Sequence, residues 1–349
     1  MALRGNLTVD RMARIYILLL SVLIAACGAT PVKEQNPAAK VQESRPAIVE
    51  PAVIVPIFDA DSAYAFVDAQ IAFGPRVPNT SSHRKCGEYL VDKLRGYGAE
   101  VVTQDVKLKA YNGDMLDARN IIAQFQPQKS DRILLCAHWD SRPWADSDPD
   151  KANHYKPVPG ANDGGSGVGI LLEIARQLSQ VPTALGVDII LFDAEDYGLH
   201  EKDMDKYYSN RHSWALGSQY WASNPHRKGY AARYGILLDI VGAPGSRFLH
   251  EGYSMHFASD VVAKVWDLAG KLGYTDYFIQ EEGGTITDDH YYVSSISGIP
   301  CIDIINCDMD SPNGFGIHHH TVKDDMDWID ANTLKAVGQT VMTVIYNEK

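Results

Sequence analysis

Apolar positions recur with two different periods along this chain, and the two periods predict alternating helices and strands. Apolar residues repeat with helical spacing at 62–73, about 80–98, 166–178, 214–222, 257–272 and from Asp330 onward. Short apolar or alternating runs predict strands at 101–108, 120–125, 133–137, 187–192, 234–240 and 299–305. The length of 349 residues suits one large α/β domain or two small ones.

The strand predicted at 187–192 ends abruptly in acidic residues. Its apolar run is typical of a strand covered on both faces, and Asp193, Glu195 and Asp196 follow at once. Open α/β sheets carry their chemistry at the carboxyl ends of strands. Adjacent Glu195 and Asp196 repel each other unless a cation or a shared proton intervenes. We therefore predict that one of them binds a metal and the other is a general base; the alternative is a solvated acidic turn.

Polar residues in three other places are further candidates. His138 and Asp140 follow the strand at 133–137, where residues two apart can face one cleft, or they form a hydrogen-bonded pair near the surface. Asp163 stands among glycines, which suggests either a metal ligand or a capping residue; the run lacks the lysine of a phosphate loop. Asp239 interrupts the apolar strand at 234–240, where burying an acid is costly.

The N-terminus has the features of an export signal. Arg11 and Arg14 precede the apolar run Ile15–Ile24, which is too short for a comfortable membrane span and fits a secretory signal. The run closes on Leu23–Cys27, which resembles a bacterial lipobox and implies lipid attachment to Cys27. The signal works from Met1 or from Met12 as the start, and the alternative is a cytosolic protein with an apolar N-terminus.

We accordingly expect a lipoprotein signal peptide over 1–27, a flexible tether over 28–57 and a catalytic domain over 58–349. Because Gly28 and not an aspartate follows the cysteine, we expect export and a lipid anchor at the outer membrane, on its periplasmic face or at the cell surface. This lipid is the only expected membrane contact.

Composition excludes one class of partner. The hydrophobic fraction of 45% is ordinary for a globular protein, and the net charge of −12 argues against binding nucleic acid. Cys86, Cys136, Cys301 and Cys307 do not have the spacing of a zinc knuckle. We expect them to be free buried thiols, although a Cys301–Cys307 disulfide stays open.

Six short motifs occur in a characteristic order, namely HWD at His138, GANDGGSG around Asp163, FDAED at Glu195 and Asp196, LLDIVG at Asp239, DDH at Asp288 and HT at His320. Together they resemble the family of zinc aminopeptidases that also includes the glutaminyl cyclases. The resemblance runs from about Phe58 to the C-terminus. It implies a single α/β domain with a twisted mixed, mostly parallel central sheet and helices on both faces.

The resemblance also implies roles for individual residues. Asp163, Asp196 and His320 match the zinc ligands, which leaves one position open on tetrahedral zinc. Glu195 matches the general base. His320 is chosen from three consecutive histidines because a threonine follows it; His318 and His319 are then second-layer or pocket groups, or exposed.

Two enzyme activities fit this set of ligands. The family's aminopeptidases bind a second zinc through residues that match His138 and Asp239, and both are present. Three features favour a glutaminyl cyclase of the Bacteroidetes type: Asp288 replaces the usual serine, the LLDIVG run looks like the cyclase version, and a long insertion follows Asp196. In cyclases an acid at the place of Asp288 belongs to a Glu–Asp–Asp network with the matches of Glu195 and Asp239.

The resemblance therefore implies a zinc-dependent acyltransferase, a glutaminyl-peptide cyclotransferase that uses one zinc and converts N-terminal glutamine of peptides and proteins to pyroglutamate with release of ammonia. Trp214, Phe315 and His319 are the expected pocket residues; His319 stands where animal cyclases have tryptophan. The alternatives are a two-zinc aminopeptidase and a surface-tethered binding protein on an inactive scaffold.

Overall fold

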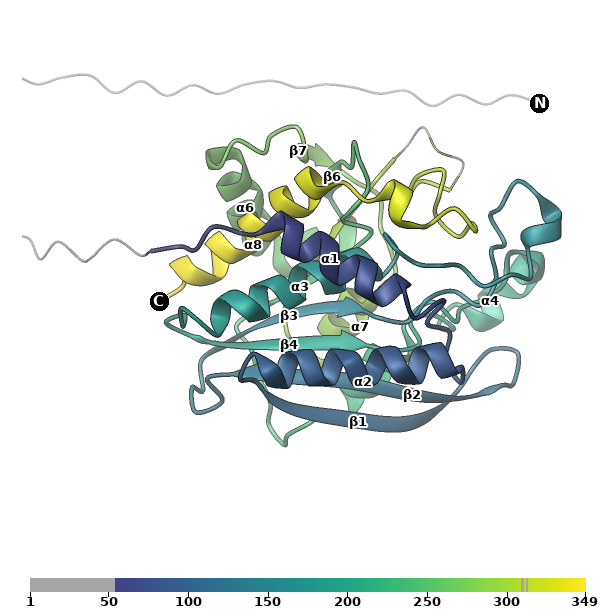
Figure 1. Cartoon of the computed structure of the whole chain (residues 1–349), viewed down its shortest axis with the longest axis horizontal. Helices are drawn as coiled ribbons and strands as arrows, with labels where there is room; N and C mark the ends of the chain where they lie inside the picture. The colour runs from purple at the N-terminus through teal and green to yellow at the C-terminus, as the bar shows by residue number, and fades with distance from the viewer. Residues whose placement is uncertain (1–53, 309–310, 312) are drawn as a thin grey trace, which may run out of the picture. The chain divides into compact units, whose positions relative to one another are not determined.

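A central sheet with helices on both faces forms the domain (Figure 1). The computed structural model describes residues 54–308, 311 and 313–349. The predicted signal peptide and most of the predicted tether lie outside these residues. The sheet has six strands in the order β1-β2-β4-β3-β5-β8. Their bounds are β1 (Glu100–Lys109), β2 (Met115–Phe125), β3 (Arg132–His138), β4 (Gly186–Phe192), β5 (Gly235–Asp239) and β8 (Cys301–Ile305).

The sheet is mixed and mostly parallel, as predicted. Strands β4, β3, β5 and β8 run parallel to one another, whereas β1 and β2 are antiparallel to their neighbours. A separate pair, β6 (Phe248–His250) and β7 (Phe278–Glu282), forms a small parallel sheet. The sequence did not predict this pair, because the strands are short and the end of β7 is exposed.

Helices cover the two faces of the sheet unequally. Their bounds are α1 (Ala60–Ile71), α2 (Ser81–Gly96), α3 (Gly165–Leu178), α4 (Tyr207–Asn210), α5 (Leu216–Ser223), α6 (Gly252–Lys271), α7 (Asp289–Tyr292) and α8 (Ala331–Asn347). One apolar cluster joins α1, α2, α3, α6 and α8 to alternate residues of the strands, such as Ile133 and Leu135. The residue between them, Leu134, packs on the other face with α5 and the turn after α7. Alternation along β3 thus fills two cores at once.

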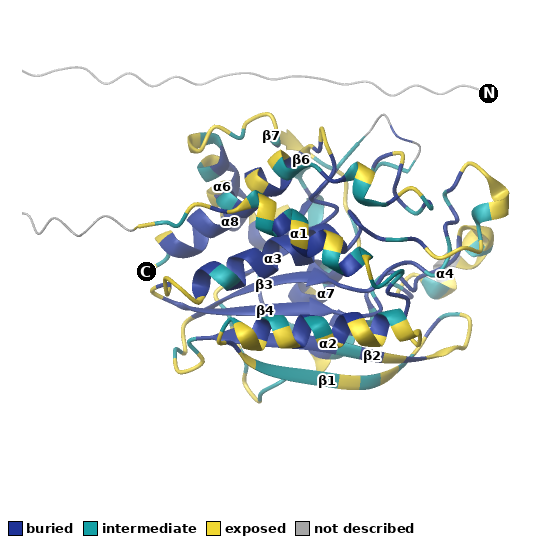
Figure 2. Cartoon of the chain, in the orientation of Figure 1, coloured by how far each residue is buried: buried dark blue, intermediate teal, exposed yellow. Residues whose placement is uncertain are grey.

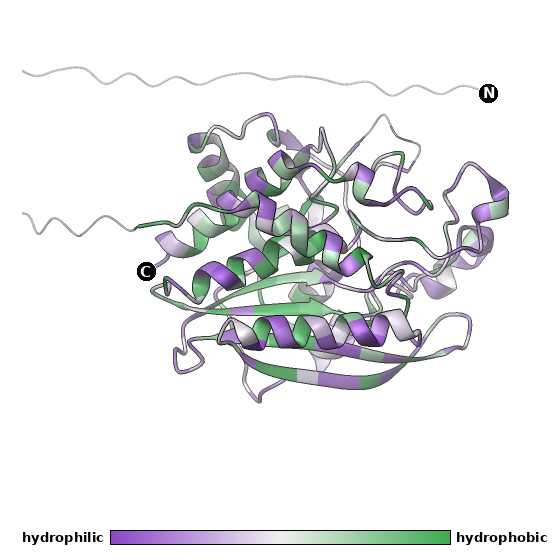
Figure 3. Cartoon of the chain, in the orientation of Figure 1, coloured by the Kyte–Doolittle hydropathy of each residue, from purple (hydrophilic) through white to green (hydrophobic). Residues whose placement is uncertain are grey.

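The innermost strands are buried along their whole length, as Figure 2 shows, and Figure 3 shows how apolar they are. Every residue of β3 and β4 is buried. The edge strand β1 alternates between half-buried and exposed residues, and its lysines Lys107 and Lys109 discourage pairing with another chain. The strands that carry the candidate acids therefore lie at the centre of the core.

Helix α3 packs so closely on the sheet that one position in it requires glycine. A Cβ at Gly167 would lie 2.3 Å from the carbonyl oxygen of Leu238, which is a backbone atom of β5. This close approach places the turn before α3, which carries Asp163, against the ends of β3 and β5. The helix is capped at Gly164 without a side-chain hydrogen bond, so Asp163 is not the capping residue.

The remaining predictions about local structure have mixed outcomes. The cysteines Cys86, Cys136, Cys301 and Cys307 are free, so the Cys301–Cys307 disulfide does not form. The insertion after Asp196 is a surface segment as expected, but it contains a 3₁₀-helix, Glu201–Lys206, and then α4. Within the part of the chain that the structure describes, none of the helices combines the length and the apolar character needed to cross a bilayer.

A buried ion pair fastens β3 to β4 at the end opposite the candidate acids. The Arg132 guanidinium donates to both carboxylate oxygens of Asp188 at 2.6 Å, and neither side chain is exposed. The Tyr230 hydroxyl also donates to Asp188 at 2.8 Å. Such a pair is costly to break because the remaining charge stays buried without its partner.

We predict that Asp188→Ala lowers the free energy of unfolding by about 3–5 kcal/mol, since it leaves the Arg132 charge uncompensated in the core. Urea unfolding followed by circular dichroism would measure the loss. Asp131→Ala is the matched control, because it removes an exposed carboxylate that also pairs with an arginine, Arg233. Equal losses in the two variants would contradict the prediction.

Candidate active site

The carboxyl ends of the parallel strands surround a cavity of about 370 Å³. Its lining includes most of the residues that the sequence singled out, namely Asp163, Glu195, Trp214, Asp239, Asp288, Phe315, His319 and His320. Asp196 and His138 do not line it but are buried directly against it, as the contacts below show. The predicted site residues therefore come together in one place, although they are spread over most of the domain sequence.

His320 contacts both Asp163 and Asp196. His320 Nε2 lies 3.2 Å from Asp196 Oδ1 and 3.5 Å from Asp163 Oδ2. Ligand atoms at about 2.0–2.1 Å from a tetrahedral zinc ion are about 3.3 Å apart, so these two spacings fit a shared metal. Within the described residues, Asp163 Oδ2 and Asp196 Oδ2 are buried and accept no hydrogen bond. Buried carboxylate oxygens without a donor are what a cation would coordinate.

The charges of these residues also suit a cation. Burial, and next the Arg142 charge, lower the pKa of His320 to about 3, so its imidazole is neutral, as a metal ligand must be. Burial opposes ionisation of Asp163, but the hydrogen bond and charge of His138 outweigh it and lower the pKa of that carboxyl. Burial, followed by repulsion from Asp163, raises the pKa of Asp196 well above its usual range. A cation between the two acids would relieve that repulsion.

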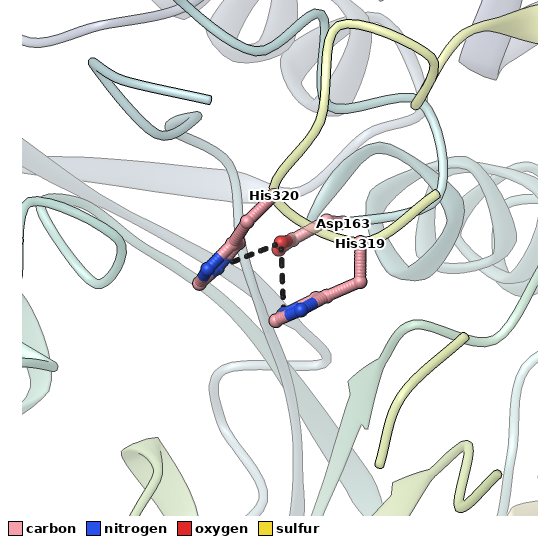
Figure 4. A group of neighbouring side chains, drawn as sticks. All are labelled: Asp163, His319 and His320. Carbon is pink, nitrogen blue, oxygen red and sulfur yellow. Dashed lines mark ion pairs between the residues drawn. The ribbon is translucent and has the colours of Figure 1, made fainter. Parts of the chain in front are cut away.

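His319 and His320 both turn toward Asp163 (Figure 4). His319 Nε2 lies 3.6 Å from Asp163 Oδ2, and the two imidazole rings are stacked with centroids 3.6 Å apart. His320 also reaches Asp196, which favours it as the third ligand. His318 points elsewhere, since it contacts the Asn162 amide and stacks on Trp328.

His138 occupies the centre of a second group of ligand-type residues. Its Nε2 lies 3.0 Å from Asp163 Oδ1 and 3.1 Å from Asp239 Oδ1. Burial opposes protonation of His138, but Asp239 and the other carboxylates around it raise its pKa well above the usual value. A protonated His138 bridges the two acids and neutralises part of their charge. The same three residues have the spacing of a metal site.

Asp140, only weakly marked by the sequence, orients both acids after β4. Its two oxygens accept from the backbone N–H groups of Glu195 at 3.0 Å and Asp196 at 3.2 Å. It also lies 3.5 Å from His138 Nδ1, so His138 and Asp140 interact as predicted, but deep inside the protein and not near the surface. Asp140 thus links the β3 end to the β4 end.

Unusual backbone conformations mark the same strand ends. Ala194, Ile240 and His320 have φ of 54°, 50° and 56°, although none of them is glycine. Each such residue costs roughly 1–3 kcal/mol and persists only where the surrounding structure enforces it. Ala194 precedes Glu195, and Ile240 follows Asp239. The strain therefore lies where the backbone has to turn candidate side chains into the cavity.

Three acids that line the cavity, of which Asp239 and Asp288 are buried and Glu195 is half-buried, have raised affinities for protons. Burial, and next the charge of Asp288, raise the pKa of Glu195 well above its usual range. Burial raises the pKa of Asp239 to about 7 and also raises the pKa of Asp288. Carboxyl groups that hold protons near neutral pH are suited to acid–base catalysis and to sharing a proton.

Arg142 was not identified from the sequence. It is buried, donates to the Asp196 carbonyl oxygen at 3.1 Å, and pairs with both oxygens of Asp146. Its guanidinium also lies 4.6 Å from the ring centre of Trp214, whose other neighbour is His320 in a parallel stack. A single arginine in a loop between two predicted motifs carries no signal in one sequence. Only the fold reveals that it supports Asp196 and Trp214.

Another cavity, of about 400 Å³, lies between α2 and the edge strands and includes His83, Lys107 and Arg119. Three of its basic side chains already have acidic partners, because Lys107 pairs with Asp117, Arg119 with Asp105, and His83 with the buried Asp193. The fourth, Arg84, donates to the carbonyl oxygen of Asn79. It has no group comparable to the acids around Glu195. The chemistry is therefore to be sought at the first cavity.

Two solved structures resemble this chain over nearly all of its described part. A Zn-dependent exopeptidase from Parabacteroides distasonis is 55% identical with a TM-score of 0.83, and the match covers 84% of this chain and 100% of that one. A glutaminyl cyclase from Tannerella forsythia is 56% identical with a TM-score of 0.82, with coverage of 84% and 100%.

Curated relatives are more distant. Aminopeptidase YwaD of Bacillus subtilis is 26% identical over 286 residues, which cover 78% of this chain and 54% of the relative. The chain spans about half the length of the curated relatives that it matches. Residues 120–345 match peptidase family M28, a stretch that includes every predicted site residue. The chain therefore belongs to peptidase family M28.

Proposed function

We propose that this protein is a glutaminyl-peptide cyclotransferase that closes N-terminal glutamine of peptides and proteins to pyroglutamate and releases ammonia. The observation that carries the proposal is the position of Asp288, which lines the same cavity as Glu195 and Asp239. Three acids with raised pKa values face one cavity, which suits a reaction in which a proton moves between two nitrogens. The similarity to glutaminyl cyclases at 54–56% identity supports it.

The reaction joins two groups of one residue. The α-amine nitrogen forms a bond to the carbonyl carbon, Cδ, of the side-chain amide of the same glutamine, and the bond from that carbon to the amide nitrogen breaks. Because both groups belong to one residue, the protein mainly has to fold the substrate and keep water out. The aromatic rings of Trp214 and Phe315, which line the cavity, provide an apolar wall for this purpose.

Glu195 is the group that moves the proton. It takes a proton from the α-amine and gives it to the departing amide nitrogen, so that ammonia leaves neutral. Its raised pKa matches this double role, since a carboxylate of ordinary pKa would be too weak a base to take the proton from the amine. Asp239 and Asp288 share a proton and hold the amide nitrogen by hydrogen bonds as it leaves.

Asp163, Asp196 and His320 would hold the zinc ion. When bound, zinc would polarise the γ-carbonyl group and stabilise negative charge on its oxygen. We propose one zinc and not two, because Asp239 then stays available to share a proton with Asp288, which lines the same cavity.

The second candidate function is a two-zinc aminopeptidase. The observation that favours it is the grouping of His138, Asp163 and Asp239 at metal-site spacing, which would make Asp163 a bridging ligand. A leucine aminopeptidase precursor from Bacteroides thetaiotaomicron is also 54% identical to this chain. In this reading Asp288 has no proton to share with Asp239, because Asp239 would be a ligand.

One pair of assays separates the two functions. The domain from about Val53 onward would be given a peptide with N-terminal glutamine or a leucine anilide, and its zinc content would be counted. We expect ammonia release and loss of the free amine, with one zinc per chain and no cleavage of the anilide. Cleavage of the anilide with two zinc ions per chain would establish the aminopeptidase in its place.

We predict that Glu195→Gln lowers kcat by about 10²–10⁴-fold and leaves zinc bound, because glutamine keeps the shape but cannot accept the proton. Steady-state rates and metal analysis of the same sample would measure both. Glu201→Gln, an exposed glutamate on the insertion, is the control and should be unaffected. A nearly normal rate in Glu195→Gln would remove Glu195 from its assigned role.

We predict that Asp140→Ala weakens zinc binding by about 10–100-fold, because the backbone N–H groups of Glu195 and Asp196 lose the acceptor that orients them. Competition with a chelator of known affinity would measure the change. Asp59→Ala is the control, since Asp59 also accepts from a backbone N–H, that of Ser62, but does not line the cavity. Unchanged affinity in Asp140→Ala would show that the turn keeps its shape without this support.

A further inference from the structure

The rim of the cavity carries a positive charge that the reaction does not use. Arg211 is the one lysine or arginine side chain among the residues that line the cavity. It is exposed, whereas Asp163, Asp239 and Asp288 at the floor of the cavity are 4–7% exposed. The charges are thus arranged in depth, with acids at the bottom and a cation at the opening.

The side chain of Arg211 is held in place by the core. Its Nε donates to Nε2 of His212 at 3.1 Å, and Nδ1 of His212 lies 2.9 Å from the hydroxyl of Tyr292. Because His212 Nε2 accepts, the proton of this imidazole is assigned to Nδ1, which then donates to Tyr292. Tyr292 is 3% exposed and belongs to α7, the helix that starts directly after Asp288.

This contact leaves the terminal nitrogens of the guanidinium without an anionic partner. No carboxylate forms an ion pair with Arg211 in the part of the chain that the structure describes, whereas the neighbouring insertion residue Lys206 pairs with Asp203. A guanidinium offers a planar fork of donors that matches a carboxylate. Arg211 is therefore free to bind a carboxylate that arrives with the substrate.

The proposed reaction determines which part of a peptide reaches Arg211. Both reacting groups of the first residue, the α-amine and the γ-amide, have to lie at the acidic floor. The chain can then leave only through the α-carbonyl, toward the opening. Since one extended residue spans about 3.3–3.6 Å, the second and third side chains pass the rim.

We propose that Arg211 is a specificity-determining residue that selects peptides with aspartate or glutamate as the second or third residue, where the N-terminal glutamine is the first. This inference rests on the proposed cyclase function and names its preferred substrate class. The net charge of −12 and the acidic floor otherwise repel acidic peptides, so a local cation is needed to accept them. Arg211 acts on binding and takes no part in proton transfer.

The test compares two peptides that differ only at the second position, Gln-Glu-Ala-Ala and Gln-Lys-Ala-Ala, each with an amidated C-terminus. We expect the wild-type domain to cyclise the glutamyl peptide with the higher kcat/KM. In Arg211→Gln the ratio of the two kcat/KM values should fall about threefold to tenfold, mainly through KM, because the cation interacts equally with the ground and transition states. Arg211→Lys should keep part of the preference.

Two controls separate this inference from the function on which it rests. Lys335→Gln removes an equal charge at an exposed position of α8 that does not line the cavity, and the ratio should not change. Raising the salt concentration should reduce the preference of the wild type, because the contact is exposed. Cyclisation of both peptides with the same ratio in wild type and Arg211→Gln would overturn the assignment of Arg211 alone. Failure to cyclise either peptide would overturn the proposed function and, with it, this inference.

Discussion

The main constraint on this site is the negative charge that is crowded at the carboxyl ends of the parallel strands, and the other groups of the site have to compensate it. Asp163, Glu195, Asp239 and Asp288 line one cavity and Asp196 lies against it, and burial withdraws all of these carboxyl groups but that of the half-buried Glu195 from water. Uncompensated, so many buried charges would unfold a domain of ordinary stability. The compensation comes from His138, from Arg142, from retained protons and from the proposed zinc ion. Catalytic and structural roles of these groups are therefore hard to separate.

The support for this arrangement comes from elements that touch no substrate. Asp140 orients the turn after β4, and Arg142 joins that turn to Trp214. Asp324 accepts from the backbone N–H groups of Asn162 and Asp163, and burial raises its pKa to about 8. Each of these contacts links the end of one strand to a loop from elsewhere. The geometry of the site is thus a property of the whole sheet edge.

The sequence predicted the fold and most of the site residues because both depend on patterns that are local. Continuous apolar runs marked β3 and β4, and helical spacing of apolar residues marked α2. Acids placed directly after such runs predicted which side chains meet. The resemblance to a known family supplied the roles that spacing alone could not.

What the sequence could not provide depends on contacts between distant segments. The pairing of Arg142 with Asp196, the stacking of Trp214 on His320, and the link from Arg211 to Tyr292 all join residues that no local pattern relates. Strands β6 and β7 were not predicted for a different reason, because they are short and half exposed. Features of this protein were therefore missed in the sequence for two reasons, either because they depend on long-range contacts or because their local pattern is weak.

The dispersal of the ligand-type residues has a consequence for how this protein would acquire its ion. Asp163, Asp196 and His320 come from three separate loops, the last of them near the C-terminus, and they meet only after the sheet has assembled. An unfolded chain offers no partial site of the kind that closely spaced cysteines provide. The ion is then selected by the surroundings in which the chain folds and not by those in which it is synthesised. Metal supply at the place of folding, more than intrinsic affinity, would decide which ion the enzyme carries.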